Sequence, residues 1–540
     1  MPVRPRRLRL LVASLCAFLA TAASACTTSS PPATPGGRDT TQITLATAEE
    51  PDTLNPLLGY APSGAAKIFD GLLEHGADGA LHPALATEVP QPSADDRSWT
   101  VPLRTGVKFS DGTPFGAADV VATYRAVLDP ATASPLRPRY DMLTSVDEVN
   151  ATTVRFNLAY PYPAFPNLLV LGILPARALG QPGPLTASPI NTHPIGTGPY
   201  QLTEWQRGVR MVLSANPTYF DGPPAVRKVT VLFGGDDATR ASRTLAGDID
   251  GAPVAPAQTR DLPRSGGYLL ATHNSAEYRT VSMPGRNPVT ADPAVRLALN
   301  QAVNRRAMVD GTLAGKGEPA STPIPSTMPE FVEPGATFGY DRAQAGRTLD
   351  AAGWVPGPDG IRARGGTPAR FTLLTPSGDA VALALAQQFA ADARAVGVDV
   401  RVDQVDRDNL RARVNQDAAL LTGGNAFDPD LQAYRLLHSS ASPGVAATGE
   451  PVDPGSYADA RVDAALDAGR REIDPAQRAA DYRAFQRAYL ANPGMVFLVF
   501  QQHTYALRND WTGYQEVADA AEQGITWGPW WNLEKWEPKR

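Results

Sequence analysis

The sequence predicts an α/β protein of more than one domain, on three observations. A chain of 540 residues is far longer than one ordinary domain and can bury more than one core. Residues 371–375, 381–396 and 398–402 read as strand, amphipathic helix and strand, which is the rhythm of a βαβ unit. Residues 98–121 read as a strand, a turn and a helix. The composition, 43% hydrophobic and 19% charged, is that of a soluble globular chain.

The stretch from Ser98 to Val121 is the most informative local pattern. Alternating apolar residues predict a strand that begins at Ser98, breaks at Thr105-Gly106 and resumes through Val107 and Phe109. Ser, Asp, Gly, Thr and Pro at 110–114 predict a turn. A helix should follow, with one apolar face formed by Ala117, Val120, Val121, Tyr124 and Val127.

Composition excludes several functions. A net charge of −6 argues against nucleic acid as a partner, because no basic tract beyond the N-terminus could neutralise phosphates. The only cysteines are Cys16 and Cys26, so the rest of the chain has no disulfide and no thiolate metal site. No metal or cofactor is predicted, since the histidines show no i, i+4 pair and no H-E-x-x-H. Each is expected at the surface or supporting a neighbouring group: His75, His82, His193, His273, His438 and His503.

The N-terminus predicts export. Four arginines precede an apolar run at 10–20 that ends in small residues, which is typical of a signal peptide over residues 1–25. The alternative, a membrane-spanning helix, needs about 20 apolar residues, and this run is too short. Arg6-Arg7 leaves twin-arginine export open beside the general secretory route.

Residues 23–26, Ala-Ser-Ala-Cys, are similar to a bacterial lipobox, although Ala23 stands where Leu is usual. The resemblance implies cleavage before Cys26 after its thiol is diacylated, and two acyl chains hold a protein stably at a membrane face. Ordinary secretion is the alternative. Residues 26–42 are rich in Ser, Thr, Pro and Gly and predict a flexible tether.

The string L-R-x-G-V-K-F-x-D-G-T-P at 103–114 resembles the signature of the family 5 solute-binding proteins of ABC importers, which include dipeptide-, oligopeptide- and nickel-binding proteins. Further family motifs follow in the family's order, so that the resemblance covers about residues 43–540. They are P-x-x-L-[DN]-P at 51–56, I-F-[DE]-G-L at 68–72, x-P-x-L-A at 82–86, G-T-G-P-Y at 196–200 and D-x-x-V-R at 292–296. The G-T-G-P-Y run lacks the Lys-[ST] of a phosphate loop. Arg296 is expected to act as a structural cap or to form an ion pair rather than to contact a ligand.

The resemblance implies a two-lobed α/β fold of the periplasmic-binding-protein type (type II, cluster C), with a hinge and an extra α/β domain on lobe I. Carried over, lobe I combines residues 43–60, 192–272 and 502–540, the extra domain spans 61–191, and lobe II spans 273–501. A ligand that touches both lobes only when they are closed stabilises the closed state by those contacts.

In peptide-binding relatives, an Asp in a loop of the form G-W-x-x-D-x-x-D-P pairs with the ligand's ammonium. Aligned on Asp428-Pro429, Asn425 stands at that position, and the Trp is absent. An amide can accept a hydrogen bond but brings no charge, and an unpaired buried charge is expensive. Either Asp428 or Asp430 supplies the charge, or the ligand is not an ordinary peptide. Alternatively, Asn425 only shapes the turn.

Other positions that match the family's cleft are Gly59 and Tyr60 in lobe I, the residues just after Asp250, and Gln501-Gln502 near the second hinge crossing. Tyr60 could serve packing or stacking equally well. With Asn425 and Asp428, these complete the predicted ligand-binding set.

The resemblance thus implies a monomeric, lipid-anchored extracytoplasmic receptor that presents a peptide or peptide-like solute to an ABC permease and its ATPase. Alternatives are a receptor for another solute, such as a nickel chelate or glycoside, and a binding protein that serves sensing. An enzyme is not expected, because the sequence has no G-x-S-x-G elbow, Walker loop or dinucleotide fingerprint. A carboxylate-pair hydrolase is not excluded by the residue inventory alone.

Overall fold

The computed structural model describes residues 39–48, 50–180, 183–260, 267–440, 444–445, 451–452, 457–521 and 524–539. The predicted signal peptide, Cys26 and most of the predicted tether lie outside these ranges. Residues Thr40–Arg540 form one compact unit. Within the described residues, none of the helices combines the length and apolar character needed to cross a bilayer.

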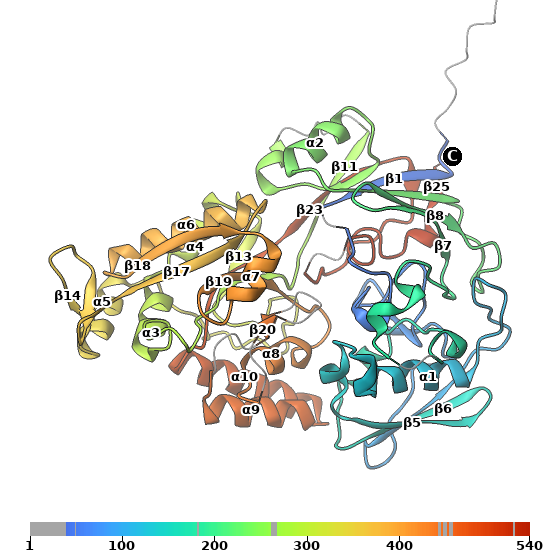
Figure 1. Ribbon diagram of the computed structural model, residues 1–540, viewed down its shortest axis with the longest axis horizontal. Coiled ribbons are helices and arrows are strands. Elements are labelled where there is room, and N and C mark those ends of the chain that lie inside the picture. Colours follow the sequence, from blue (N-terminus) through green and yellow to red (C-terminus); the bar gives the residue numbers. More distant parts are fainter. Residues whose placement is uncertain are drawn as a thin grey trace, which may run out of the picture. The chain divides into compact units, whose positions relative to one another are not determined.

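A seven-stranded mixed sheet gathers strands from distant parts of the chain (Figure 1). Strand β1 (Gln42–Thr47) lies parallel to both of its neighbours, β9 and β10, whereas all other strand pairs in this sheet are antiparallel. In sheet order the strands are β11 (Tyr268–His273), β23 (His503–Arg508), β10 (Gly251–Pro253), β1 (Gln42–Thr47), β9 (Lys228–Phe233), β8 (Arg210–Ala215) and β7 (Tyr200–Gln206).

A six-stranded sheet forms the centre of the second large region. In sheet order its strands are β13 (Gly317–Pro319), β22 (Val496–Gln501), β12 (Tyr278–Val281), β19 (Ala418–Gly423), β17 (Arg370–Pro376) and β18 (Asp399–Val405). Helix α6 (Ala380–Ala395) connects β17 to the parallel β18 and packs on both, which confirms the predicted βαβ unit.

Most helices begin at an Asp or Asn whose side chain accepts a backbone N–H of the first turn, as N-caps do. Helices α9 and α10 lie side by side, and α8 contacts α9 (Figure 1). The helices besides α6 are α1 (Ala117–Leu128), α2 (Asp237–Leu245), α3 (Pro293–Ala302), α4 (Arg305–Gly311), α5 (Arg342–Ala351), α7 (Arg407–Arg413), α8 (Asp430–Leu437), α9 (Ala460–Arg471) and α10 (Pro475–Ala491).

A three-stranded antiparallel sheet carries the region around the Ser98 stretch. Its order is β4 (Ser98–Pro102), β6 (Thr153–Leu158) and β5 (Leu143–Asn150), and α1 packs on β5 and β6. All five residues of the predicted apolar helix face are buried, which confirms that face. The predicted resumption of the strand at Val107 and Phe109 is wrong: after Gly106, at φ +78°, the chain forms only an isolated bridge between Lys108 and Pro114.

Smaller paired strands complete the structure. They are β2 (Leu73–His75) with β3 (Leu81–Pro83), β14 (Val355–Pro356) and β16 (Thr367–Pro368) with β15 (Arg362–Arg364), β20 (Gly444–Val445) with β21 (Pro451–Val452), and β24 (Trp511–Thr512) with β25 (Glu537–Pro538).

The buried apolar clusters show how these parts combine. One cluster joins the seven-stranded and three-stranded sheets, since Leu213 of β8 and Phe156 of β6 both belong to it. The six-stranded sheet has a separate cluster on each face: Leu373 and Leu374, consecutive in β17, belong to different ones. We therefore call the region of the seven- and three-stranded sheets lobe I and the region of the six-stranded sheet lobe II.

Two of the family motifs meet in lobe I. Asp70 of the I-F-D-G-L motif accepts a hydrogen bond from Thr197 of G-T-G-P-Y (2.7 Å) and another from Tyr219 (3.2 Å). Burial, opposed by these bonds, raises the pKa of Asp70 to about 7. A Cβ on Gly198 would lie 2.6 Å from the Lys67 carbonyl oxygen, so this glycine is required for packing rather than for a phosphate.

Candidate solute site at the lobe crossings

The chain passes between the two lobes at two neighbouring places. Residues 274–277 connect β11 to β12, and Gln502 alone separates β22 from β23. The crossings are bonded to each other: Ser275 Oγ donates to the Gln501 carbonyl (2.5 Å), and Gln502 Nε2 donates to Asn274 Oδ1 (2.8 Å). Two adjacent chain segments that are hydrogen-bonded to each other can act as a hinge that bends as one unit.

A buried charge network lies against this hinge. Asp519 contacts the Nδ1 atoms of both His273 and His503, each at 2.9 Å, and His503 Nε2 lies 3.1 Å from Glu277. Burial opposes the charge of His503, but Glu277 and Asp519 outweigh it and raise its pKa to about 10. The pKa of Asp519 is lowered, because the bonds from both histidines outweigh its burial. These two histidines are therefore internal supports of the hinge and not surface residues.

Gln501 ends β22 next to the hinge, and its predicted contact with a ligand stays a prediction. Its backbone N–H donates to the Glu277 carbonyl (2.9 Å), and its carbonyl accepts from Ser275. Its side-chain Oε1 is buried without a hydrogen-bond partner in the described part of the chain. Buried acceptors are normally paired, so this oxygen lacks the partner that such atoms usually have.

The loop from Gly424 to Asp430 leads from β19 into α8. Asn425 is buried, and its Oδ1 accepts the N–H groups of Phe427 (2.9 Å) and Asp428 (3.2 Å), which is the geometry of a turn-shaping residue. Asp428 is paired with Arg478 at 2.7 Å. Its charge is therefore compensated within lobe II, and its predicted role toward a ligand stays a prediction.

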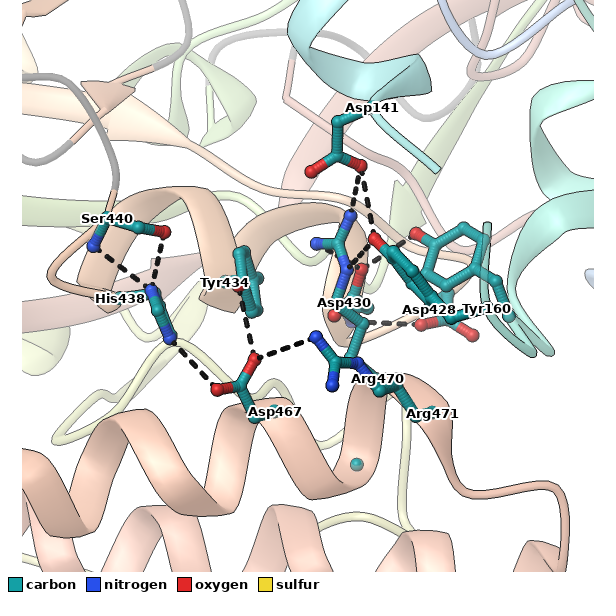
Figure 2. A network of polar contacts seen from close by, with 12 residues as sticks. Asp141, Tyr160, Asp428, Asp430, Tyr434, His438, Ser440, Asp467, Arg470 and Arg471 are labelled. Carbon is teal, nitrogen blue, oxygen red and sulfur yellow. Dashed lines mark hydrogen bonds and ion pairs between the residues drawn. The ribbon is translucent and has the colours of Figure 1, made fainter. Parts of the chain in front are cut away.

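The Asp430 carboxylate also has several partners within the protein (Figure 2). It lies 3.3 Å from Arg470 and accepts hydrogen bonds from the hydroxyls of Tyr162 (2.7 Å) and Tyr482 (3.2 Å). Burial, the largest influence, raises the pKa of Asp430 despite the opposing arginine. Neither carboxylate of this loop is left without a basic partner for a ligand ammonium.

An aromatic cluster joins the same loop to lobe I. The ring of Phe427 stacks on His75 with centroids 3.5 Å apart and planes 8° apart, and it meets Trp527 edge-on at 4.9 Å. Trp531 lies next to Trp527 at 5.9 Å. Burial lowers the pKa of His75 to about 3, so the imidazole in this stack is neutral at physiological pH. The cluster is an apolar contact between the loop and lobe I, with His75, Trp527 and Trp531 all buried.

The remaining predicted site residues lie in packed surroundings. Gly59, at φ +97°, ends a short 3-10 helix, and Tyr60 is buried with its hydroxyl donating to the Ala66 carbonyl (3.2 Å). The packing alternative for Tyr60 therefore agrees with its contacts. Just after Asp250, residues 251–253 are strand β10, and Asp250 itself accepts from the Thr44 N–H (2.8 Å).

Arg296 has the structural role that was predicted. Its Nε donates to the Pro493 carbonyl (2.8 Å) and its Nη1 to the Ala291 carbonyl (2.7 Å). It is buried within lobe II and joins the start of α3 to the turn before β22.

Sequence reasoning did not identify His75, Phe427, Trp527, Trp531 or Arg470. One signal was present: three of the eight tryptophans of the chain stand within W-G-P-W-W at 527–531. Such a density of large amphipathic rings near one end of a chain is typical of a binding surface or a core. For Arg470 no local pattern existed, since its partner Asp141 lies 329 residues away.

Comparison with known proteins agrees with this architecture. A family model described as "Bacterial extracellular solute-binding proteins, family 5 Middle" matches residues 80–444. Protein XP55 of Streptomyces lividans is 42% identical over 510 residues, which cover 94% of this chain and 92% of that protein.

Two solved structures are similar over 92% of this chain and 99% of their own, each at 25% identity. One is NikZ of Campylobacter jejuni in complex with Ni(L-His), with a TM-score of 0.83. The other is the oligopeptide-binding protein AppA of Bacillus subtilis in complex with a nonapeptide, with a TM-score of 0.81. These likenesses confirm the predicted two-lobed α/β fold class.

Proposed function

The chain belongs to the bacterial extracellular solute-binding proteins of family 5, and we propose that it binds one peptide or peptide-like solute between its lobes and delivers it to an ABC permease. The observation that carries the proposal is the pair of bonded crossings at 274–277 and 502, set between lobes with separate cores. A solute held by both lobes stabilises their closed arrangement, which a permease can distinguish from the open one.

Groups at the hinge and in the loop 424–430 indicate the class of solute. Gln501 offers an unpaired amide oxygen, and the Phe427 cluster places apolar side chains where the loop meets lobe I. The carboxylates of Asp428 and Asp430 are both paired with arginine. A solute recognised through hydrogen-bond donors and apolar groups fits these partners better than one that depends on a free ammonium.

The solute can be identified from what copurifies with the protein. We expect native mass spectrometry to show one bound compound per chain, and calorimetry with peptides of two to nine residues to find saturable binding. Gln501→Leu removes the unpaired amide at similar volume, and we expect it to weaken binding by about tenfold. Binding of no member of the panel, with only a metal chelate retained, would move the solute to the non-peptide class.

Attachment to the membrane is a further part of the proposal. The support is the run Ala23-Ser24-Ala25-Cys26 after a short apolar segment. Labelling with a radioactive fatty acid should mark the wild type, and Cys26→Ser should abolish the label and release the protein into the medium. Release of wild type and variant alike would favour ordinary secretion.

The domain boundaries and the monomeric state belong to the same proposal. The strand composition of the two large sheets supports residues 43–60, 192–272 and 502–540 as the part of lobe I around the seven-stranded sheet, 61–191 as the extra domain on lobe I, and 273–501 as lobe II. Mass photometry is expected to give one species at the mass of a single chain.

A further inference from the structure

Contacts other than the hinge join the two lobes at the loop 424–430 and at α9. The Tyr162 hydroxyl, in lobe I, donates to Asp430 Oδ2 at the start of α8 (2.7 Å). Arg470 of α9 pairs with Asp141 (2.6 Å) and donates from Nε to the Tyr160 hydroxyl (3.0 Å), as Figure 2 shows. Both Asp141 and Tyr160 flank the three-stranded sheet of lobe I.

The same loop makes an apolar contact with lobe I. Phe427 lies against His75 of β2 and Trp527 of the C-terminal segment, and Leu431 packs against the lobe I core. The polar and aromatic contacts therefore come from two places in lobe II, residues 427–431 and Arg470 of α9. We call Tyr162, Asp430, Arg470 and Phe427 the latch residues.

The latch is built so that it can open. Asp430 keeps Arg470 and Tyr482 as partners within lobe II when lobe I moves away. Its buried charge therefore stays compensated, and a charge left without a partner is what would otherwise prevent opening. The bond from Tyr162 and the stack of Phe427 on His75 are made only when the lobes are together.

We propose that the latch residues hold the lobes closed before any solute arrives, and so act as positioning residues for solute binding. A contact that exists in only one of two states raises the population of that state by its own free energy. The latch thus sets the balance between open and closed chains, and with it the fraction of molecules in the arrangement that encloses a solute.

Distances between two labels test this without any solute. The full chain with Cys16→Ser and Cys26→Ser has no other cysteine, so Val149→Cys in β5 and Val355→Cys in β14 place one spin label on each lobe. Both positions are exposed, at 47% and 60%. In solute-free protein, pulsed electron resonance should show one dominant short distance. Tyr162→Phe should add a longer one and lower the closed-to-open ratio by about tenfold, and Phe427→Ala should act in the same direction.

The matched control is Tyr482→Phe. It removes the other hydroxyl on the same carboxylate, but from α10 within lobe II, so the distance distribution should stay that of the parent. If Phe427→Ala is poorly folded, Phe427→Leu is measured in its place. Because Leu keeps an apolar side chain, this variant should retain most of the closed population. An unchanged distribution in Tyr162→Phe, an equal shift in Tyr482→Phe, or a parent that is already open would overturn the proposal. Solute binding itself would still stand, since a receptor that is open when empty can close on its solute.

Discussion

Asp519 contacts both buried histidines of the hinge, and the charge of one of them, His503, depends on the fold. Burial opposes that charge, yet Glu277 and Asp519 raise the pKa of His503 to about 10, against about 6.5 in an unfolded chain. The folded-state pKa is the higher of the two. The stabilisation is therefore complete below pH 6.5 and is lost as the pH rises to 10.

We expect His503→Gln to lower the free energy of unfolding by on the order of 3 kcal/mol at pH 6, and the difference from wild type to shrink toward zero at pH 10. Urea unfolding at pH 6, 8 and 10 measures this. His193→Gln, on an exposed segment, serves as the control. A deficit of constant size at all three pH values would show that the charge of His503 is not its source.

Asn425 gives a second prediction at the level of one side chain. Its Oδ1 already accepts two backbone N–H groups, and a carboxylate at this position can keep both bonds while it adds charge. If the side chain also faces the solute, Asn425→Asp should raise the affinity for free-amine peptides about tenfold and leave N-acetylated peptides unchanged. Calorimetry with the two peptide sets decides this, and no change for either set would remove Asn425 from the site.

Candidate residues of the site could be found from the sequence only where a motif marks them. Asn425 and Asp428 were located by their alignment on Asp428-Pro429, but Arg478, which neutralises Asp428, lies 50 residues away with no motif of its own. Long-range partners of this kind depend on how α10 and the loop pack together. The same applies to Phe427, whose ring meets His75 from a different lobe.

Among the structural elements, the turn at G-T-G-P-Y shows how a motif can act through packing alone. Gly198 lies against the backbone of Lys67 and Ile68, where an added Cβ has no room. Gly198→Ala should therefore lower the free energy of unfolding by about 2 kcal/mol, as overpacking does. Gly339→Ala is the matched control, because nothing lies within 4 Å of its added Cβ. Equal urea midpoints for the two variants would contradict the packing role.

The elements that were predictable are those with a long, regular period. The βαβ unit from β17 to β18 was recognisable because α6 repeats its apolar residues over 16 positions. At Val107 and Phe109 the alternation was equally clear, and both side chains are indeed buried. There the N–H of Phe109 donates to the carbonyl of Thr113 across a tight turn and not to a neighbouring strand. The alternation of apolar residues therefore predicted which side chains are buried, but not that the segment pairs as a β-strand.

In the whole molecule, the grouping of the buried clusters determines which parts unfold together. The seven-stranded and three-stranded sheets of lobe I share one apolar cluster, whereas lobe II has clusters of its own on both faces of its sheet. Parts that share a core lose their packing together. We therefore expect calorimetry to resolve two unfolding transitions and not three, although the predicted organisation has three parts.

Three substitutions assign the transitions. Leu213→Ala in the seven-stranded sheet and Phe156→Ala in the three-stranded sheet each empty a fully buried position of the shared cluster, at a cost of about 2–5 kcal/mol, and should lower the same transition temperature. Phe389→Ala in α6 should lower only the other, since Phe389 belongs to lobe II. If Leu213→Ala and Phe156→Ala shift different transitions, the extra domain unfolds separately from the seven-stranded sheet, and the shared cluster does not couple the two parts of lobe I.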